Sequence, residues 1–200
     1  YDANQAALTA FFAYHPWLYL VLVPAVGMRL WAEERKSGTI ELLFTLPVTL
    51  TEAVLAKFFA GWAFLGIALA LTFPMVITVN YLGAPDNGVI LAGYLGSFMM
   101  AGSYLAVTCL TSALTKNQVI SFILGVIICF VMVLLGWGTF TNVMANFLPS
   151  VAIDVISSLG FMTHFQSISR GLIDSRDIIY FASVILVALS LNTIVLETRK

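Results

Sequence analysis

The chain alternates between long stretches without a charged residue and short polar clusters. Charged residues are absent from four windows, at residues 58–85, 87–115, 117–153 and 178–196. Each window is long enough for the roughly 20 apolar residues that a helix needs to cross a hydrocarbon layer of ~30 Å. Lipid offers no partners to backbone polar groups, so segments of this kind fold as helices.

The pattern predicts five membrane-spanning helices, at about residues 16–32, 53–80, 89–114, 119–135 and 177–196. Pro16 suits the first turn of the first helix, and Pro24 predicts a kink within it. Small residues follow one side of the third helix at Ala92, Gly93, Gly96, Ser97, Ala101 and Gly102. They allow close helix approach, either at a sliding interface between bundles or, as we favour, in ordinary internal packing.

Composition supports an all-α integral membrane protein. Apolar residues make up 60% of the chain and charged residues only 10%, against about 25% charged residues in soluble domains. The net charge of −1 argues against a nucleic-acid partner, which would require a basic surface. Cys109 and Cys129 fall inside spans, where small buried hydrophobes are favoured over a disulfide or a metal pair.

The basic residues predict the orientation of the spans. One face collects Arg29, Arg35, Lys36, Lys57, Lys116, Arg199 and Lys200, whereas Arg170 and Arg176 fall on the other. Since basic residues concentrate on the cytoplasmic side, the linker over residues 33–57 and the C-terminal end are expected there. Residue 1 then lies outside. We therefore expect a further helix before it and six helices in the full subunit.

The predicted cytoplasmic linker, residues 33–52, contains an apolar helix over residues 40–46 that ends at Pro47. Such a helix lies at the membrane interface or between the bundle and another protein. Thr49 and Glu52 form a capping box that restarts the chain as the second span. The charged run at residues 33–36 is either a solvated stop-transfer cluster or a docking surface, and the apolar helix favours docking.

The predicted external segment, residues 138–176, is long for a loop and is expected to contain short helices that enter the outer leaflet. Asp174 is the predicted N-cap of the last span. Arg170, Asp174, Arg176 and Asp177 are candidates for surface ion pairs. His164 is a candidate ligand or proton sensor, but a lone histidine without a second ligand favours interfacial packing.

Motifs for catalysis are absent from the sequence. No Gly-x-x-x-x-Gly-Lys-Ser/Thr phosphate loop, zinc-binding His-Glu-x-x-His or nucleophilic Gly-x-Ser-x-Gly occurs. No acidic or basic residue falls in the middle of a predicted span, which argues against a proton-coupled pump. We therefore expect a non-enzyme without a bound cofactor or metal, so that any motor is a separate chain.

Three separated motifs resemble the ABC type-2 permeases. Residues 28–49, MRLWAEERKSGTIELLFTLPVT, match the family's segment after its second span. Residues 114–118 (LTKNQ) and 169–177 (SRGLIDSRD) resemble the gliding-motility-type subgroup. The three motifs lie in the family's order along the chain, but the family's first span is missing.

The resemblance implies a single transmembrane permease domain over residues 1–200, in the bacterial cytoplasmic membrane. It also implies a second permease copy and a cytoplasmic ATPase subunit that holds ATP and Mg²⁺. The implied ATPase contacts are Glu33, Glu34, Arg35, Gly38, Thr39, Glu41 and Pro47. The implied external gate or cap contains His164, Phe165, Ser169, Arg170 and Asp174.

Three functions remain in competition at this stage. The leading one is substrate translocation by alternating access, driven by ATP hydrolysis in the separate subunit. The alternative is a membrane anchor for a motility or envelope-assembly complex, which keeps the docking linker but needs no path. A lipid-modifying enzyme using His164, Asp154 or Asp174 is the weakest, because no base and nucleophile are suitably spaced.

Overall fold

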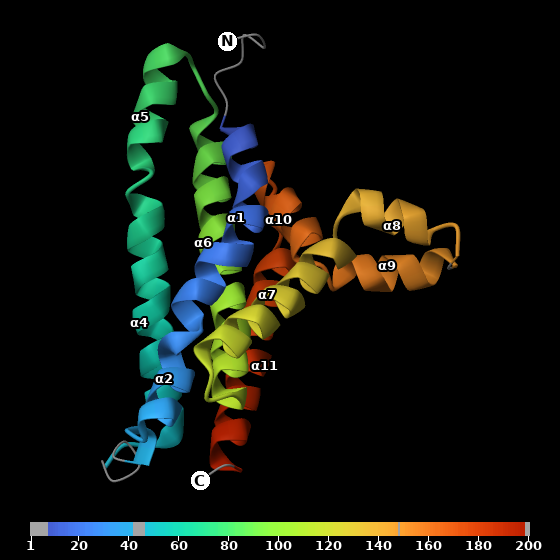
Figure 1. Ribbon diagram of the computed structural model, residues 1–200. Coiled ribbons are helices and arrows are strands. Elements are labelled where there is room, and N and C mark those ends of the chain that lie inside the picture. The colour runs from blue at the N-terminus through green and yellow to red at the C-terminus, as the bar shows by residue number, and fades with distance from the viewer. Residues whose placement is uncertain (1–7, 42–46, 148, 199–200) are drawn as a thin grey trace.

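The computed structural model describes residues 8–41, 47–147 and 149–198, and every long element within these ranges is helical (Figure 1). Five helices or helix pairs are long and apolar enough to cross a membrane, which confirms an all-α integral membrane fold. The described helices are α1 (Thr9–Gly27), α2 (Arg29–Ser37), α4 (Leu50–Ala70), α5 (Phe73–Leu82), α6 (Asn87–Leu114), α7 (Gln118–Leu135), α8 (Gly138–Met144), α9 (Ser150–Ser158), α10 (Phe161–Ser169) and α11 (Ser175–Glu197).

Helix α6 is the centre of the bundle and packs against α1, α2, α4, α7, α10 and α11. Its small residues face large side chains of these neighbours. Gly93 lies against Phe12, and Gly102 lies against the indole of Trp62. A Cβ on either glycine would approach those rings to within 2.6–2.8 Å, too close for a real contact. The small residues therefore serve packing within one chain, the interpretation favoured from the sequence.

The first span is longer than predicted and breaks at a different place. Helix α1 begins at Thr9, so Pro16 lies inside the helix rather than in its first turn. The interruption falls at Met28, one turn after Pro24. There the Ser112 hydroxyl donates to the Met28 carbonyl (2.8 Å) and accepts from the backbone N–H groups of Trp31 and Ala32 (3.0 Å each). A side chain inserted into the helical ladder explains a bend that proline alone does not.

The second span also departs from one continuous helix. The predicted capping box is confirmed, since Thr49 and Glu52 bond reciprocally at the start of α4. The helix then breaks between Ala70 and Phe73, just before Pro74. Pro74 cannot donate to the preceding turn, so it begins a new helix instead of continuing the old one. Helix α5 has no buried residue in the chain.

The remaining spans follow the predicted boundaries closely. Helix α6 ends at Leu114 and α7 ends at Leu135, as the hydrophobic pattern indicates. Asn117 caps α7 by accepting from the Val119 N–H at 2.9 Å. Asp174 caps α11 by accepting from the Arg176 N–H at 3.1 Å, which confirms that prediction.

The segment after α7 contains the expected short helices, but they have two different environments. Helices α8 and α9 project sideways from the bundle (Figure 1), and no residue of either is buried. Helix α10 instead buries Phe161, Met162, Phe165 and Ile168. The apolar face of α10 thus packs against the bundle, and the entry of these short helices into the outer leaflet stays a prediction.

The first span contains a buried histidine. Because α1 begins upstream of Pro16, His15 belongs to the first span and is buried. Its Nδ1 lies 2.6 Å from the Ser97 Oγ on α6, and its ring stacks on Tyr19. The short side chain of Ser97 leaves room for the imidazole and also gives it a polar partner.

The described turns divide between two ends of the bundle. Figure 1 shows the end of α2, the α6–α7 turn and the end of α11 at one extreme, which we call the α2 end. The α5–α6 turn lies at the opposite extreme. The α10–α11 turn belongs with it, because Gly171 contacts Val89 at the start of α6. This arrangement follows the order of five crossings predicted from the sequence.

Candidate functional site at the α2 end

Helix α2 is joined to α4 by Lys57. The ammonium forms an ion pair with the Glu34 carboxylate and donates to the Leu30 carbonyl at 2.7 Å. It also lies 4.4 Å from the centroid of the buried Trp31 ring. A charge this close to an aromatic face gains a favourable cation–π interaction. Lys57 thus contacts three residues of α2, namely Leu30, Trp31 and Glu34.

A second set of contacts joins α2 to α6. The Arg35 guanidinium donates to the Ala113 carbonyl near the end of α6. One residue earlier, Ser112 bonds to the three backbone groups around the Met28 break. The Trp31 indole N–H donates to the Cys109 sulfur at 3.3 Å. Since α4 and α6 both hold α2, movement of α2 must displace them as well.

The predicted ATPase-contact residues fall into two groups. Glu34 and Arg35 are partly buried and bonded within the chain. Glu33, Gly38, Thr39, Glu41 and Pro47 are exposed. The exposed residues are therefore available to a partner, whereas Glu34 and Arg35 hold the element that presents them. Reversing the charge of Glu34 would break the Lys57 pair, whereas reversing that of Glu33 would not.

Gly38 sets the direction of the chain after α2. It adopts a left-handed conformation (φ 75°) as the C-cap, which glycine accepts without a Cβ clash. Ser37 supports the turn, since its hydroxyl donates to the Glu33 carbonyl at 2.9 Å. Of the predicted apolar helix over residues 40–46, Ile40 and Glu41 are helical, while residues 42–46 lie outside the described residues.

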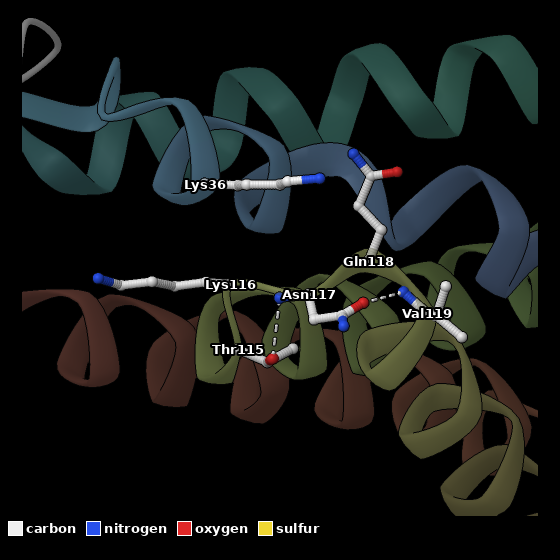
Figure 2. A pocket seen from close by; sticks show the side chains of 6 residues that line it. All are labelled: Lys36, Thr115, Lys116, Asn117, Gln118 and Val119. Carbon is white, nitrogen blue, oxygen red and sulfur yellow. Dashed lines mark hydrogen bonds between the residues drawn. The ribbon is translucent and has the colours of Figure 1, made fainter.

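A cavity of about 400 Å³ opens beside α2 at the same end. It is lined by Lys36, Thr115, Lys116, Asn117, Gln118 and Val119. Figure 2 shows the Lys36 side chain extending toward Gln118, while Lys116 extends the other way. The Thr115 hydroxyl accepts from the Asn117 N–H, and the Asn117 side chain accepts from the Val119 N–H at the start of α7. The α2 end therefore combines an exposed acidic and polar turn with a cavity flanked by lysines.

The predicted external residues do not converge on one site. Phe165 is buried and lies against Gly96 of α6. Arg170 and Asp174 are exposed, and Ser169 bonds within its own helix. In the described part of the chain, neither Asp174 nor Asp177 forms an ion pair with an arginine, so the expected surface pairs do not form. His164 instead hydrogen-bonds to Asp177 on α11 and to the Ser158 carbonyl on α9, and its ring stacks on Tyr180 of α11.

Comparison with known proteins identifies the family. The chain matches the family described as "ABC-2 family transporter protein" over residues 17–196, which includes every described spanning helix in whole or in large part. The chain belongs to the ABC-2 transporter family. The resemblance drawn from residues 28–49 is thereby confirmed at the level of the family.

Two curated relatives come from Escherichia coli strains K12 and O157:H7. Each carries the name "Probable multidrug ABC transporter permease YbhS" and is 32% identical over 122 residues. The match covers 59% of this chain but only 32% of each relative. The chain thus aligns with about a third of the relatives' length.

The motifs of the ABC-2 family did not reveal the residues that hold α2. Lys57 was noted only as a basic residue near one face, and Ser112 carried no signal, since serine is common in packed spans. A lysine one helical turn or so inside an apolar span does call for a buried anionic or aromatic partner. Trp31 and Glu34 were the available partners on the preceding helix.

Proposed function

We propose that this chain couples ATP hydrolysis by a separate ATPase subunit to substrate movement across the bacterial cytoplasmic membrane. The family match over residues 17–196 is the observation that carries the proposal. The exposed turn that follows α2, from Gly38 to Glu41, would contact the ATPase. ATP and Mg²⁺ would be held by that partner, since the phosphate loop is absent from this sequence.

The attachment of α2 supports this role. A force on the exposed turn reaches α4 through Lys57 and Glu34, and it reaches α6 through Arg35 and Ser112. Because α6 packs against nearly every other span, a displacement at its end changes the packing of the whole bundle. Alternating access requires such a rigid element between motor and path.

A second permease copy completes the proposed transporter. The hydrophobic face of α4 and α5 is exposed in the single chain, with Phe64, Ile67 and Leu71 at 59–74% of their full exposure. Such a surface suits lipid or the partner copy. The gliding-motility-type motifs at residues 114–118 and 169–177 suggest the branch of the family to which the transporter belongs.

Site-specific crosslinking tests the proposed partner. A photoreactive residue replaces Thr39 in the full-length protein, and crosslinking is carried out in native membranes. We expect a covalent product with an ABC-type ATPase, identified by its phosphate-loop peptide. The matched control replaces Tyr81, which is 90% exposed at the far end of α5. Products with lipid alone at position 39, or the same ATPase product at both positions, would overturn the proposal.

A further inference from the structure

His164 connects three helices at the end of the bundle opposite α2. Its Nε2 lies 2.8 Å from the Ser158 carbonyl oxygen at the end of α9. Its Nδ1 lies 2.7 Å from the Asp177 Oδ1 in the first turn of α11. The ring stacks on Tyr180 with centroids 3.9 Å apart. These contacts fix both ring nitrogens and the plane of the imidazole.

The two partners determine how many protons the cluster holds. A backbone carbonyl only accepts, so Nε2 must carry a hydrogen. At 2.7 Å, the bond between Nδ1 and Asp177 also needs a hydrogen, supplied either by the ring or by the carboxyl group. In both forms the pair contains one proton more than a neutral histidine beside a carboxylate. Removing that proton leaves one ring hydrogen for two acceptors, so either the Nδ1 lone pair faces a negative oxygen or Nε2 has no hydrogen to donate to Ser158.

Among the described residues around Asp177, His164 is the group that can supply a compensating positive charge. The Asp177 side chain is only 8% exposed, and its Oδ2 has no hydrogen-bond partner among the described residues. A buried carboxylate without a positive partner is strongly unfavourable. Helices α6 and α7 contain no Asp, Glu, Lys, Arg or His, and α1 contains only His15, which is bonded to Ser97.

The other ionisable groups near the cluster are accounted for. On α11, Tyr180 stacks on the ring and donates to the Leu159 carbonyl. Arg176 is exposed, and so is Asp154 on α9. On the α10–α11 turn, Arg170 and Asp174 are also exposed and form no ion pair within the described chain. The proton of the cluster therefore depends on His164 and Asp177.

We propose that His164 and Asp177 form a proton-binding site that holds α9 and α10 against α11. When the proton is bound, Nε2 donates to Ser158 and the Asp177 charge is compensated. When it leaves, the one remaining ring hydrogen can serve only one of the two acceptors, so either the Asp177 contact becomes repulsive or α9 loses its bond to His164. Attachment of the projecting α8–α9 pair is thus strongest when the proton is bound and weakens when it is removed. The inference does not depend on the proposed transport function.

Nuclear magnetic resonance can count the protons directly. The chain contains two histidines, so the ring ¹⁵N signals of His164 are assigned by their loss in His164→Gln. At about pH 6, the acidic condition of the exchange experiment, we expect two protonated ring nitrogens, or one protonated Nε2 beside a protonated Asp177 carboxyl observed through its ¹³C signal. An unprotonated Nδ1 beside an ionised Asp177 would overturn the proposal.

Hydrogen–deuterium exchange tests the structural consequence in lipid nanodiscs. Protection of residues 150–169, corrected for the intrinsic effect of pH on exchange, should fall about tenfold or more between about pH 6 and pH 9, because a charge-assisted bond is lost. Asp177→Asn should remove this dependence while the helices stay attached. Its amide can donate to Nδ1 without an added proton.

The matched control is Asp174→Asn, which makes the same charge change three residues away. Asparagine caps a helix about as well as aspartate, so this variant should keep the wild-type pH dependence. Wild-type dependence in Asp177→Asn, or its loss in Asp174→Asn, would contradict the assignment. Equal protection of residues 150–169 at both pH values in the wild type would do the same.

Discussion

The two ends of the bundle each contain one ion pair among the described residues, and the two pairs differ in chemistry. At the α2 end, Lys57 and Glu34 join α4 to α2. At the opposite end, His164 and Asp177 join α10 to α11. Lysine stays charged across the physiological range, whereas histidine exchanges its proton within it. The end proposed to receive mechanical work is therefore held by a permanent charge, and the other end by a titratable one.

The two ends also differ in how closely their glycines are packed. Gly160 lies so close to Gly136 that a Cβ would meet backbone atoms at 2.1–2.3 Å. Gly38 at the α2 end has no atom within 4 Å of its Cβ position. At the end with the His164–Asp177 pair, two backbone segments thus touch at Gly136 and Gly160. At the α2 end, Gly38 has free space around it, and only its left-handed backbone conformation restricts which residue fits there.

The largest effect should come from breaking the backbone contact at the titratable end. Gly160→Ala should destabilise the fold by about 3 kcal/mol or more, because neither backbone can yield as a flexible side chain would. The measurement is the thermal unfolding midpoint in detergent, together with the yield of monodisperse protein. Gly138→Ala is the control, since nothing lies within 4 Å of its Cβ position. Equal midpoints for both variants would show that the contact is unimportant.

A smaller effect should follow from removing the permanent charge at the α2 end. Lys57→Met keeps most of the side-chain volume but leaves Glu34 without its partner. The Lys57 and Glu34 side chains are 21% and 32% exposed, so solvent reduces the loss to about 1–2 kcal/mol. Unfolding of Lys57→Met, Glu34→Gln and the double variant gives the coupling free energy. A coupling near zero would show that the pair does not stabilise the α2 end. A loss of stability that varies between pH 6 and 9 would contradict a charge pair that stays ionised over that range.

The smallest effect should come from the open turn. Gly38→Ala forces a Cβ into the left-handed conformation and should destabilise by about 1 kcal/mol. Gly38→Asn should recover part of that loss, because asparagine tolerates this conformation better. Denaturant unfolding resolves the difference between the two variants. A stabilising Gly38→Ala would mean that the turn after α2 does not keep the left-handed form.

Much of the fold could be predicted from the sequence, because lipid imposes a strict hydrophobic length. The ends of α6 and α7, the Thr49–Glu52 capping box and the Asp174 cap all depend on neighbouring residues. Local signals of this kind are readable from one chain. The environment of α10 could not be predicted in this way, because a lipid-facing helix and a bundle-facing helix have the same apolar composition.

The candidate sites depended more on distant contacts. Ser112 lies about 80 positions from the backbone groups that it bonds, and no local pattern connects them. From the sequence, Asp177 is a candidate for a surface ion pair, because it follows Arg176 at the start of a helix. Its burial and its bond to His164 appear only when α10 folds back onto α11. The family motifs identified the segment after α2 without separating exposed residues from those that hold it.

The hydroxyl of Ser112 has a consequence for the geometry of the first span. It occupies the position between the Met28 carbonyl and the Ala32 N–H that a direct helical bond would otherwise fill. If the serine withdraws, those two groups can bond to each other, and its own hydroxyl can turn back to a carbonyl of α6. The bent and straight forms then satisfy nearly the same number of polar groups. The direction of α2 therefore depends on one hydroxyl group supplied by α6, and not on the sequence of the first span alone.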